Sequence, residues 1–259
     1  MNAIDSNVHN ARIALACLDL TSLNDVDDEA TIDAVCARAV GPQGAVAAVC
    51  VWPRFVAHAK VRVPAGVRVA AVANFPHGAL DSDAAVRDAH AIVAAGGDEI
   101  DLVLPYHAWL AGEHLACAAL VAAVRRATAG HTLKLIVESG ELRSEAAIRS
   151  ACVMGLDEGV DFLKTSTGKT PVSATPAAAR TMLEAISSHS RGHAAGFKAS
   201  GGIRTLADAQ TYIALVHEHL GADALTPLRF RIGASSLLGD IARVLGAAPP
   251  GTDASSQTY

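Results

Sequence analysis

The feature that most constrains the fold is a series of eight short apolar runs separated by segments with helical punctuation. Dividing the 259-residue chain by eight gives units of about 32 residues, the size of a strand–helix repeat. Several runs are apolar at nearly every position, as in strands buried on both faces of a parallel sheet. The predicted strands are Ile13–Leu18, Ala45–Trp52, Val67–Asn74, Glu99–Leu104, Leu133–Glu138, Asp161–Ser166, Gly196–Ser200 and Arg229–Ala234.

The segments between these runs carry helix boundary signals. Ser82 is expected to cap one helix, and Thr175 is expected to cap another that begins with Pro176. Thr205 is expected to cap a third, which ends before Gly221. Strands and helices that alternate with short connections favour the α/β class and a single closed (β/α)8 TIM barrel. An open, doubly wound sheet is the alternative.

The pattern has no internal linker and predicts one barrel domain over residues 1–246, with a short N-terminal extension. Within that extension, Met1–Asn10 is expected to form an additional helix. The remaining residues, 247–259 (AAPPGTDASSQTY), are rich in Pro, Ala and Ser and predict a flexible C-terminal tail.

Composition argues against several classes of protein. A formal net charge of −5 gives no broad basic surface for nucleic acid. The longest apolar helical stretch, Leu115–Val124, is far shorter than the roughly 20 residues that cross a bilayer. The N-terminus has no basic segment followed by an apolar one, so no secretory signal is expected. Five cysteines without CxxC spacing favour a reduced, cytoplasmic protein without a structural zinc site.

Polar residues lie at or near the ends of the predicted strands. Desolvating an ion is costly, so charges in several buried strands predict a polar cavity. In a barrel, that cavity belongs at the carboxyl ends of the strands, where active sites form. The residues concerned are Asp19, Thr21, Cys50, Asn74, Asp101, Lys134, Glu138, Lys164 and Lys198.

Lys164 and Lys198 allow two interpretations. Of the 21 basic residues only five are lysines, so lysine is much rarer than arginine in this chain. If the two lysines end adjacent strands, burial and mutual repulsion lower an amine pKa, and a neutral amine can form a Schiff base with a carbonyl carbon. Arg could not replace Lys in that role because guanidinium stays protonated. Alternatively, both lysines pair with Asp101 or Glu138 in a buried ion network, and the strand pattern does not decide between the two.

Three segments at the same predicted end are suited to an anion. Thr165–Thr170 is a hydroxyl-rich turn with Gly and Lys, and Ser200–Arg204 contains paired glycines that let backbone N–H groups approach a ligand. Gly233–Ser236 leads into a helix whose N-terminus favours negative charge. Loops after the seventh and eighth strands often bind phosphate in barrels, so the three segments together predict a phosphorylated ligand.

The chain resembles the deoxyribose-phosphate aldolase family along most of its length, from about Leu15 to Leu245 and in the same order. The most specific motifs are DFLKTSTGK and GFKASGGIR. The matching runs are LDLTSL (18–23), NFPHG (74–78), DEIDLVLP (98–105), ESGEL (138–142), DFLKTSTGK (161–169), GFKASGGIR (196–204) and RIGASSLL (231–238).

The resemblance implies a class I aldolase that reversibly cleaves 2-deoxy-D-ribose 5-phosphate to acetaldehyde and D-glyceraldehyde 3-phosphate, in deoxyribonucleotide catabolism. It implies Lys164 as the Schiff-base lysine, Lys198 as the second lysine that perturbs Lys164 and takes part in proton transfer, and Asp101 as the carboxylate of the proton relay. No cofactor or metal is implied. The implied substrate-binding residues are Asp19, Thr21 and Cys50 around the sugar, and Thr167, Gly168, Lys169, Gly201, Gly202, Gly233, Ser235 and Ser236 around the phosphate.

The C-terminal Tyr259 matches a tyrosine that some family members place in the site, so it is a candidate proton relay. The expected partners are small phosphosugars and aldehydes, not nucleic acid or membrane, and a homodimer is the expected assembly. Two other interpretations stay open. One is a metal-dependent aldolase or phosphosugar isomerase on the same barrel, and the other is a phosphosugar-binding protein without catalysis.

Overall fold

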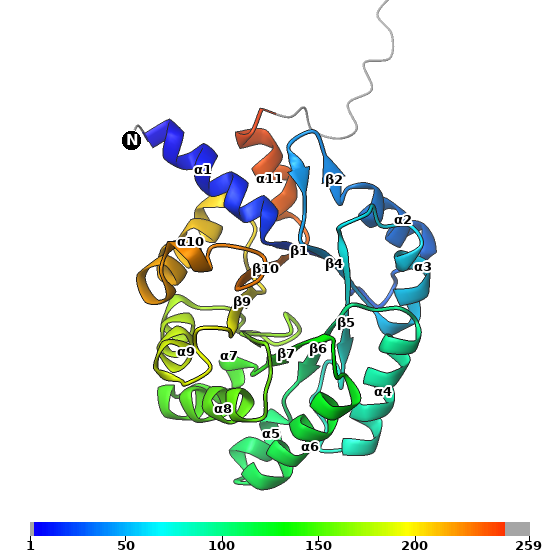
Figure 1. The fold of residues 1–259 in the computed structure, drawn as a ribbon, viewed down its shortest axis with the longest axis vertical. Helices are drawn as coiled ribbons and strands as arrows, with labels where there is room; N and C mark the ends of the chain where they lie inside the picture. The colour runs from blue at the N-terminus through cyan, green and yellow to red at the C-terminus, as the bar shows by residue number, and fades with distance from the viewer. Residues whose placement is uncertain (1–2, 247–259) are drawn as a thin grey trace, which may run out of the picture.

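The computed structural model describes residues 3–246 and confirms the predicted (β/α)8 barrel. Eight parallel strands form a closed ring in the order β1-β10-β9-β8-β7-β6-β5-β4 (Figure 1). The barrel strands are β1 (Leu18–Thr21), β4 (Ala48–Val51), β5 (Arg68–Ala73), β6 (Glu99–Val103), β7 (Thr132–Ile136), β8 (Phe162–Lys164), β9 (Gly196–Ser200) and β10 (Phe230–Ala234).

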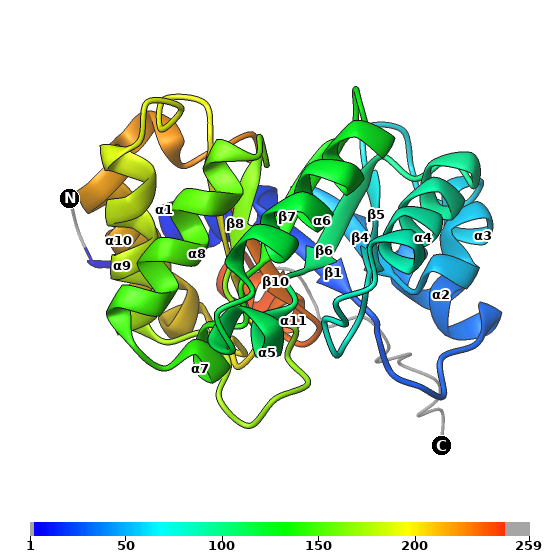
Figure 2. The same ribbon diagram turned by 90° about the horizontal axis from the view of Figure 1, so that it is seen from below.

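Helices surround this ring on its outer side (Figures 1 and 2). Two 3-10 turns, Pro53–Phe55 and Ala222–Ala224, accompany them. The helices are α1 (Ala3–Ala16), α2 (Glu29–Ala37), α3 (Val56–Lys60), α4 (Ser82–Ala94), α5 (Tyr106–Leu110), α6 (His114–Ala127), α7 (Ser139–Leu142), α8 (Glu145–Asp157), α9 (Pro176–Ser188), α10 (Leu206–Leu220) and α11 (Leu237–Val244).

Two of the three predicted helix caps are confirmed. The Thr175 hydroxyl accepts a hydrogen bond at the start of α9, and Thr205 forms a reciprocal capping box with Asp208 at the start of α10. The prediction for Ser82 is wrong by one position. Asp81 caps α4 by accepting from the backbone N–H of Ala84, and Ser82 is the first helical residue.

The first predicted strand, Ile13–Leu18, is wrong over most of its length. The helix expected over Met1–Asn10 continues through this run to Ala16, and the strand begins only at Leu18. Ala11, Ala14 and Leu15 are buried at helical spacing, and α1 packs against α10 and α11. The apolar run is therefore one face of a helix, a periodicity that a short window does not separate from a buried strand.

The run Ala45–Trp52 also divides. Only Ala48–Val51 joins the barrel, whereas its first residue belongs to a two-stranded hairpin of β2 (Val40–Gly41) and β3 (Gly44–Ala45). The segment 247–259, including Tyr259, lies outside the described residues, so its predicted flexibility and role stay predictions.

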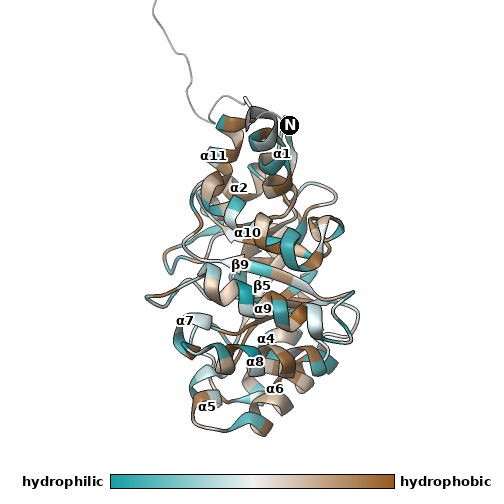
Figure 3. Cartoon of the chain, turned by 90° about the vertical axis from the view of Figure 1, so that its left-hand side faces the viewer, coloured by the Kyte–Doolittle hydropathy of each residue, from teal (hydrophilic) through white to brown (hydrophobic). Residues whose placement is uncertain are grey.

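The core lies between the helices and the outer face of the barrel. It is built from aliphatic side chains of every barrel strand and of the helices that cover them. Along α8, α9 and α10, hydrophobic stretches alternate with hydrophilic ones (Figure 3), as on helices that pack one face on a sheet. Across residues 3–246, no helix combines the length and apolar character needed to span a bilayer. The barrel interior differs from this core because it contains charged residues.

Candidate active site

Lys164 and Lys198 lie side by side inside the barrel. Lys164 is the last residue of β8, and Lys198 is its register partner on β9. Both Nζ atoms donate to the same carboxylate oxygen, Oδ2 of Asp101 on β6, each at 2.8 Å. Both lysine side chains are buried, with exposed fractions of 2% and 0%. Their amines therefore face the same interior space.

These contacts extend into a closed ring of six buried groups with alternating charge, which we call the charge ring. Lys198 also donates to Asp19 on β1 at 2.5 Å, and Asp19 accepts from Arg231 on β10 at 2.7 Å. Arg231 makes a bidentate pair with Glu99, at 2.7 and 3.1 Å. The charge ring comprises Arg231, Glu99, Lys134, Asp101, Lys198 and Asp19.

Lys134 completes the charge ring between the two acidic residues of β6. Its Nζ lies 2.6 Å from Glu99 and 2.8 Å from Asp101 Oδ1. The side chains of Glu99 and Asp101 both point inward because residues two apart on a strand share a face. Among the described residues, Lys164 is attached to the ring through Asp101, so it is a seventh ionisable group beside six whose charges already alternate.

The two catalytic candidates differ in their proton affinity. Burial lowers the pKa of Lys164, and the neighbouring ammonium of Lys198 lowers it further, against the opposing pull of Asp101. Burial also disfavours the charged form of Lys198, but Asp101 and Asp19 outweigh burial and raise the pKa of Lys198. Of the two amines, Lys164 therefore gives up its proton more readily than Lys198.

Asp101 stays ionised within this cluster. Burial alone would raise the pKa of its carboxyl, but Lys134, Lys164 and Lys198 hold that pKa well below its ordinary value. The buried ion network of the second interpretation is therefore present, with Asp101 as its carboxylate, whereas Schiff-base formation by Lys164 stays a prediction.

A polar cavity of about 270 Å³ opens at the carboxyl ends of β1, β8, β9 and β10. All three segments predicted to bind an anion line it, and so does the start of the loop after β1. The predicted residues in its wall are Thr21, Thr167, Gly168, Lys169, Gly201, Gly202, Gly233, Ser235 and Ser236. The remaining predicted substrate-binding residues, Asp19 and Cys50, are fully buried and do not line this cavity.

Glycines keep the cavity close to the lysines. A Cβ on Gly233 would lie 2.6 Å from the Ser200 hydroxyl and 3.1 Å from Cε of Lys198, so this glycine leaves the space between the cavity and the amine open. Gly168 and Gly201 have φ of +79° and +87°, and a Cβ on Gly201 would lie only 3.3 Å from the Cα of Gly168.

Glu138 organises the loop that follows Lys164. Its carboxylate accepts hydrogen bonds from the backbone N–H and the hydroxyl of Thr167 and from the hydroxyl of Thr170. Burial raises the pKa of Glu138 against those hydrogen bonds. The residue itself has φ of +53°, a conformation that costs energy for a non-glycine residue and that its loop contacts stabilise.

A small apolar cluster borders the polar cavity through Leu23, which belongs to both. Cys50 packs with Leu23, Ala48 and Val72, and burial raises the pKa of its thiol. The thiol is therefore protonated at neutral pH and acts as a small apolar group. Asn74, whose side-chain amide donates to two backbone carbonyls, stabilises its own loop.

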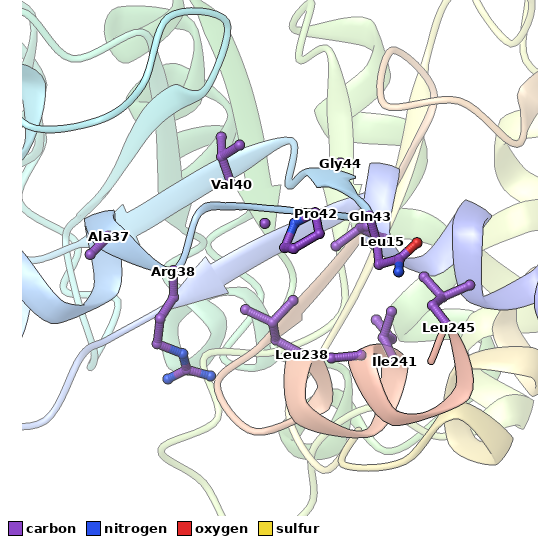
Figure 4. Close-up of a pocket in the computed structure, with 12 residues that line it drawn as sticks. Leu15, Ala37, Arg38, Val40, Pro42, Gln43, Gly44, Leu238, Ile241 and Leu245 are labelled. Carbon is purple, nitrogen blue, oxygen red and sulfur yellow. The ribbon is translucent and has the colours of Figure 1, made fainter. Parts of the chain in front are cut away.

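Another cavity, of about 240 Å³, lies outside the barrel between the β2–β3 hairpin and α11 (Figure 4). Figure 4 shows Leu238 and Ile241 of α11 on one side and Val40 and Pro42 of the hairpin on the other. This lining contains none of the predicted site residues, so the barrel interior remains the candidate active site.

Sequence reasoning missed Glu99 and Arg231 as parts of the site. Both lie at or near the amino ends of their strands, where no chemistry was expected. A signal did exist, because each is two residues from a predicted site residue, Asp101 or Gly233, and so shares its face of the strand. Arg204, which lies in a predicted anion-binding segment but was not named as a binding residue, and Asn24, which was not considered, also line the polar cavity.

Taken together, a closed barrel with a charged interior and a polar cavity at the carboxyl ends of its strands defines a (β/α)8 barrel enzyme. The particular family follows from the sequence match. The family model described as DeoC/LacD family aldolase matches residues 3–240, and the chain belongs to this family. It is therefore a member of an aldolase family whose substrates are small molecules.

Solved structures agree with this assignment. A provisionally assigned deoxyribose-phosphate aldolase from Coccidioides immitis is 28% identical, with a TM-score of 0.78 over 88% of this chain and 85% of the other. Another from Toxoplasma gondii ME49 is 24% identical and shares the fold with a TM-score of 0.86 over 94% of this chain and 97% of the other. The tetrameric deoxyribose phosphate aldolase of Aeropyrum pernix shares the fold at 23% identity and a TM-score of 0.71, over 95% and 97% of the two chains.

Proposed function

We propose that the chain is a class I aldolase that reversibly cleaves 2-deoxy-D-ribose 5-phosphate to acetaldehyde and D-glyceraldehyde 3-phosphate through a Schiff base on Lys164. The observation that carries the proposal is the buried Lys164 amine, which shares Asp101 with the neighbouring Lys198 and precedes a loop that lines a polar cavity. The membership of an aldolase family supports it. A place in deoxyribonucleotide catabolism follows from the proposed substrate.

The reaction begins with the neutral amine of Lys164. Its lone pair attacks C1 of the open-chain sugar, and the carbinolamine loses water to give an iminium. The C2–C3 bond then breaks, and its electron pair moves into the iminium to form an enamine, while the C3 hydroxyl loses its proton and becomes the aldehyde of glyceraldehyde 3-phosphate. The iminium acts as the electron sink for this step.

The second half of the cycle needs a proton at C2. Asp101 and Lys198 are the natural pair for proton transfer because the Lys198 ammonium is bonded to the same carboxylate oxygen as Lys164. Protonation of the enamine at C2 regenerates an iminium, and water releases acetaldehyde and the free amine. Lys198 supplies the proton and is reprotonated, through water, by the proton that the C3 hydroxyl released during cleavage, with Asp101 holding both amines in position.

The phosphate fixes the direction in which the sugar enters. Backbone N–H groups at Gly168, Gly201 and Gly202, together with the ammonium of Lys169, offer donors for the phosphate oxygens. Serines at the start of α11 add hydroxyls and the positive end of a helix dipole. Binding energy gained at the phosphate positions C1 toward Lys164.

Reductive trapping tests the proposal. Acetaldehyde and borohydride should add one ethyl group to the protein, and peptide mapping should place it on Lys164. The variant Lys164→Arg keeps a positive charge and is expected to give no adduct at that position. A protein that cleaves the sugar without an adduct, and that loses activity with a chelator, would be a metal-dependent aldolase, whereas binding without cleavage would indicate a phosphosugar-binding protein.

Two further parts of the proposal concern residues or copies outside the described structure. Deleting Tyr259 is expected to slow proton exchange at the methyl carbon of acetaldehyde, and unchanged exchange would remove this tyrosine from the mechanism. The predicted homodimer is checked by the mass of the protein in solution, measured by light scattering.

A further inference from the structure

The charge ring contains a feature that the proposed reaction does not use. Arg231 and Glu99 pair with each other at the amino ends of their strands, away from the phosphate cavity, and border a separate cavity of about 470 Å³ there. Both are nearly fully buried, with exposed fractions of 5% and 2%. Phe162 packs against the guanidinium, with 5.6 Å between its ring centroid and the Arg231 Cζ. We call this end of the barrel the floor.

The number of charges in the ring explains how the floor can affect the protonation of Lys164. The charge ring holds three cations and three carboxylates, so it is electrically neutral when all six are ionised. Lys164 is attached to it as a fourth basic group without a carboxylate of its own. Because an unbalanced charge in a buried site is costly, the neutral form of Lys164 is the one that the ring favours.

We propose that Arg231 and Glu99 are positioning residues that set the protonation state of Lys164 from the floor of the barrel, through the alternating contacts of the charge ring. The inference rests on the proposed function of Lys164 and adds two residues to it. Neither residue contacts Lys164. Arg231 acts through Asp19, which it shares with Lys198, and Glu99 acts through Lys134, which it shares with Asp101.

The titratable groups that face Lys164 are consistent with this route. They are Asp101 on β6, Lys198 on β9, Cys50 on β4 and Glu138 after β7. Cys50 is a protonated thiol. The carboxylate of Glu138 is occupied by the hydroxyls of Thr167 and Thr170, so Asp101 is the carboxylate that bonds the amine.

Two substitutions should shift the protonation of Lys164 in opposite directions. Arg231→Met removes a cation and leaves the ring with a surplus carboxylate, so Lys164 holds its proton to higher pH. Glu99→Gln removes a carboxylate and leaves a surplus cation, so Lys164 loses its proton at lower pH. Each shift is expected to be about one pH unit, or tenfold in the fraction of neutral amine. The double variant restores neutrality and should titrate close to the wild type.

The experiment measures the rate of acetaldehyde trapping by borohydride against pH. The acid limb of this profile should move to higher pH for Arg231→Met and to lower pH for Glu99→Gln. In the double variant it should lie at the wild-type pH. If the acid limb moves to the same side in both single variants, or does not move, the inference is overturned. A merely structural role of Arg231 and Glu99 predicts a lower rate in both variants without shifts of the acid limb in opposite directions. Arg231→Lys, which keeps the charge, should retain the wild-type limb.

Two controls keep the test decisive. If Arg231→Met does not fold, the nearly isosteric Glu99→Gln decides alone, and a limb at the wild-type position or above it would overturn the inference. If the wild type gives no adduct at any pH, the proposed function fails instead. The same variants labelled with [13Cε]lysine then still report the Lys164 titration by NMR, since the chain has only five lysines.

Discussion

Lys134 and Lys164 are both buried lysines bonded to Asp101, yet their surroundings push them in opposite directions. Lys134, toward the floor of the barrel, also bonds to Glu99, and Asp101 and Glu99 together outweigh burial and raise its pKa. Lys164, toward the phosphate cavity, has only a share of Asp101, and burial lowers its pKa.

This difference indicates that burial alone does not lower the pKa of a lysine. The number of carboxylates available to each amine decides the outcome, because a buried ammonium is stable only where opposite charges compensate for desolvation. We therefore expect one end of the same cluster to serve stability and the other to serve the proposed chemistry. Separate substitutions should therefore lower activity at Lys164 and the free energy of unfolding at Lys134.

The largest effect is expected at Lys164. Lys164→Met removes the nucleophile and should lower kcat/KM for 2-deoxyribose 5-phosphate on the order of 10⁴-fold or more. The free energy of unfolding should change by about 1 kcal/mol or less, because Asp101 keeps two other lysines. Steady-state kinetics and urea unfolding measure the two quantities. Activity within tenfold of the wild type would contradict the comparison.

Lys134→Met should act on stability instead. It leaves Glu99 and Asp101 without the ammonium between them, and breaking a buried pair in this way costs about 3–5 kcal/mol of unfolding free energy. Urea denaturation of Lys134→Met beside Lys164→Met checks the contrast directly. Equal stabilities for the two variants would show that the floor and the cavity end do not differ in role.

The pH dependence sharpens the comparison further. Because the neutral amine reacts, the rate of adduct formation should rise with pH through the pKa of Lys164 and be lost as pH falls below it. Lys198→Met removes the competing ammonium, so Asp101 stabilises the charged form of Lys164. The acid limb is then expected to move up by about one pH unit. A limb that moves down would mean that Lys198 does not compete for Asp101.

The smallest expected effect lies outside the cluster. Lys169 lines the phosphate cavity, is one-third exposed, and has only weak contacts to Asp25 and Trp52. Lys169→Gln should raise KM for the phosphorylated sugar about tenfold by removing one charge-assisted contact. Unphosphorylated 2-deoxyribose serves as the control, and its kcat/KM should stay unchanged. An equal loss of kcat/KM with both sugars would indicate that Lys169 acts in the reaction itself and not in phosphate binding.

The sequence was sufficient for the barrel and for its carboxyl-end residues. Seven of the eight apolar runs contain most or all of a barrel strand, and the polar residues that end them converge because parallel strands end at one side of a barrel. The first run failed because Ala11, Ala14 and Leu15 continue a helix into a segment that also reads as a strand.

The charge ring could not be derived in the same way. Its contacts join residues 132 and 212 positions apart, Arg231 with Glu99 and Arg231 with Asp19. Local periodicity gives the face of a strand on which a residue lies, but it does not give the distance across a closed barrel. The balance of charges, and with it the lowered pKa of one lysine among several, depends on that distance.

The most direct measurement is the titration of the individual lysines in the wild-type protein by 13C NMR of [13Cε]lysine, with each signal assigned by one substitution. We predict that Lys164 loses its proton below the ordinary lysine range near 10.4, whereas Lys134 and Lys198 stay charged beyond it. A Lys164 signal that titrates together with those of its two buried neighbours would contradict the account.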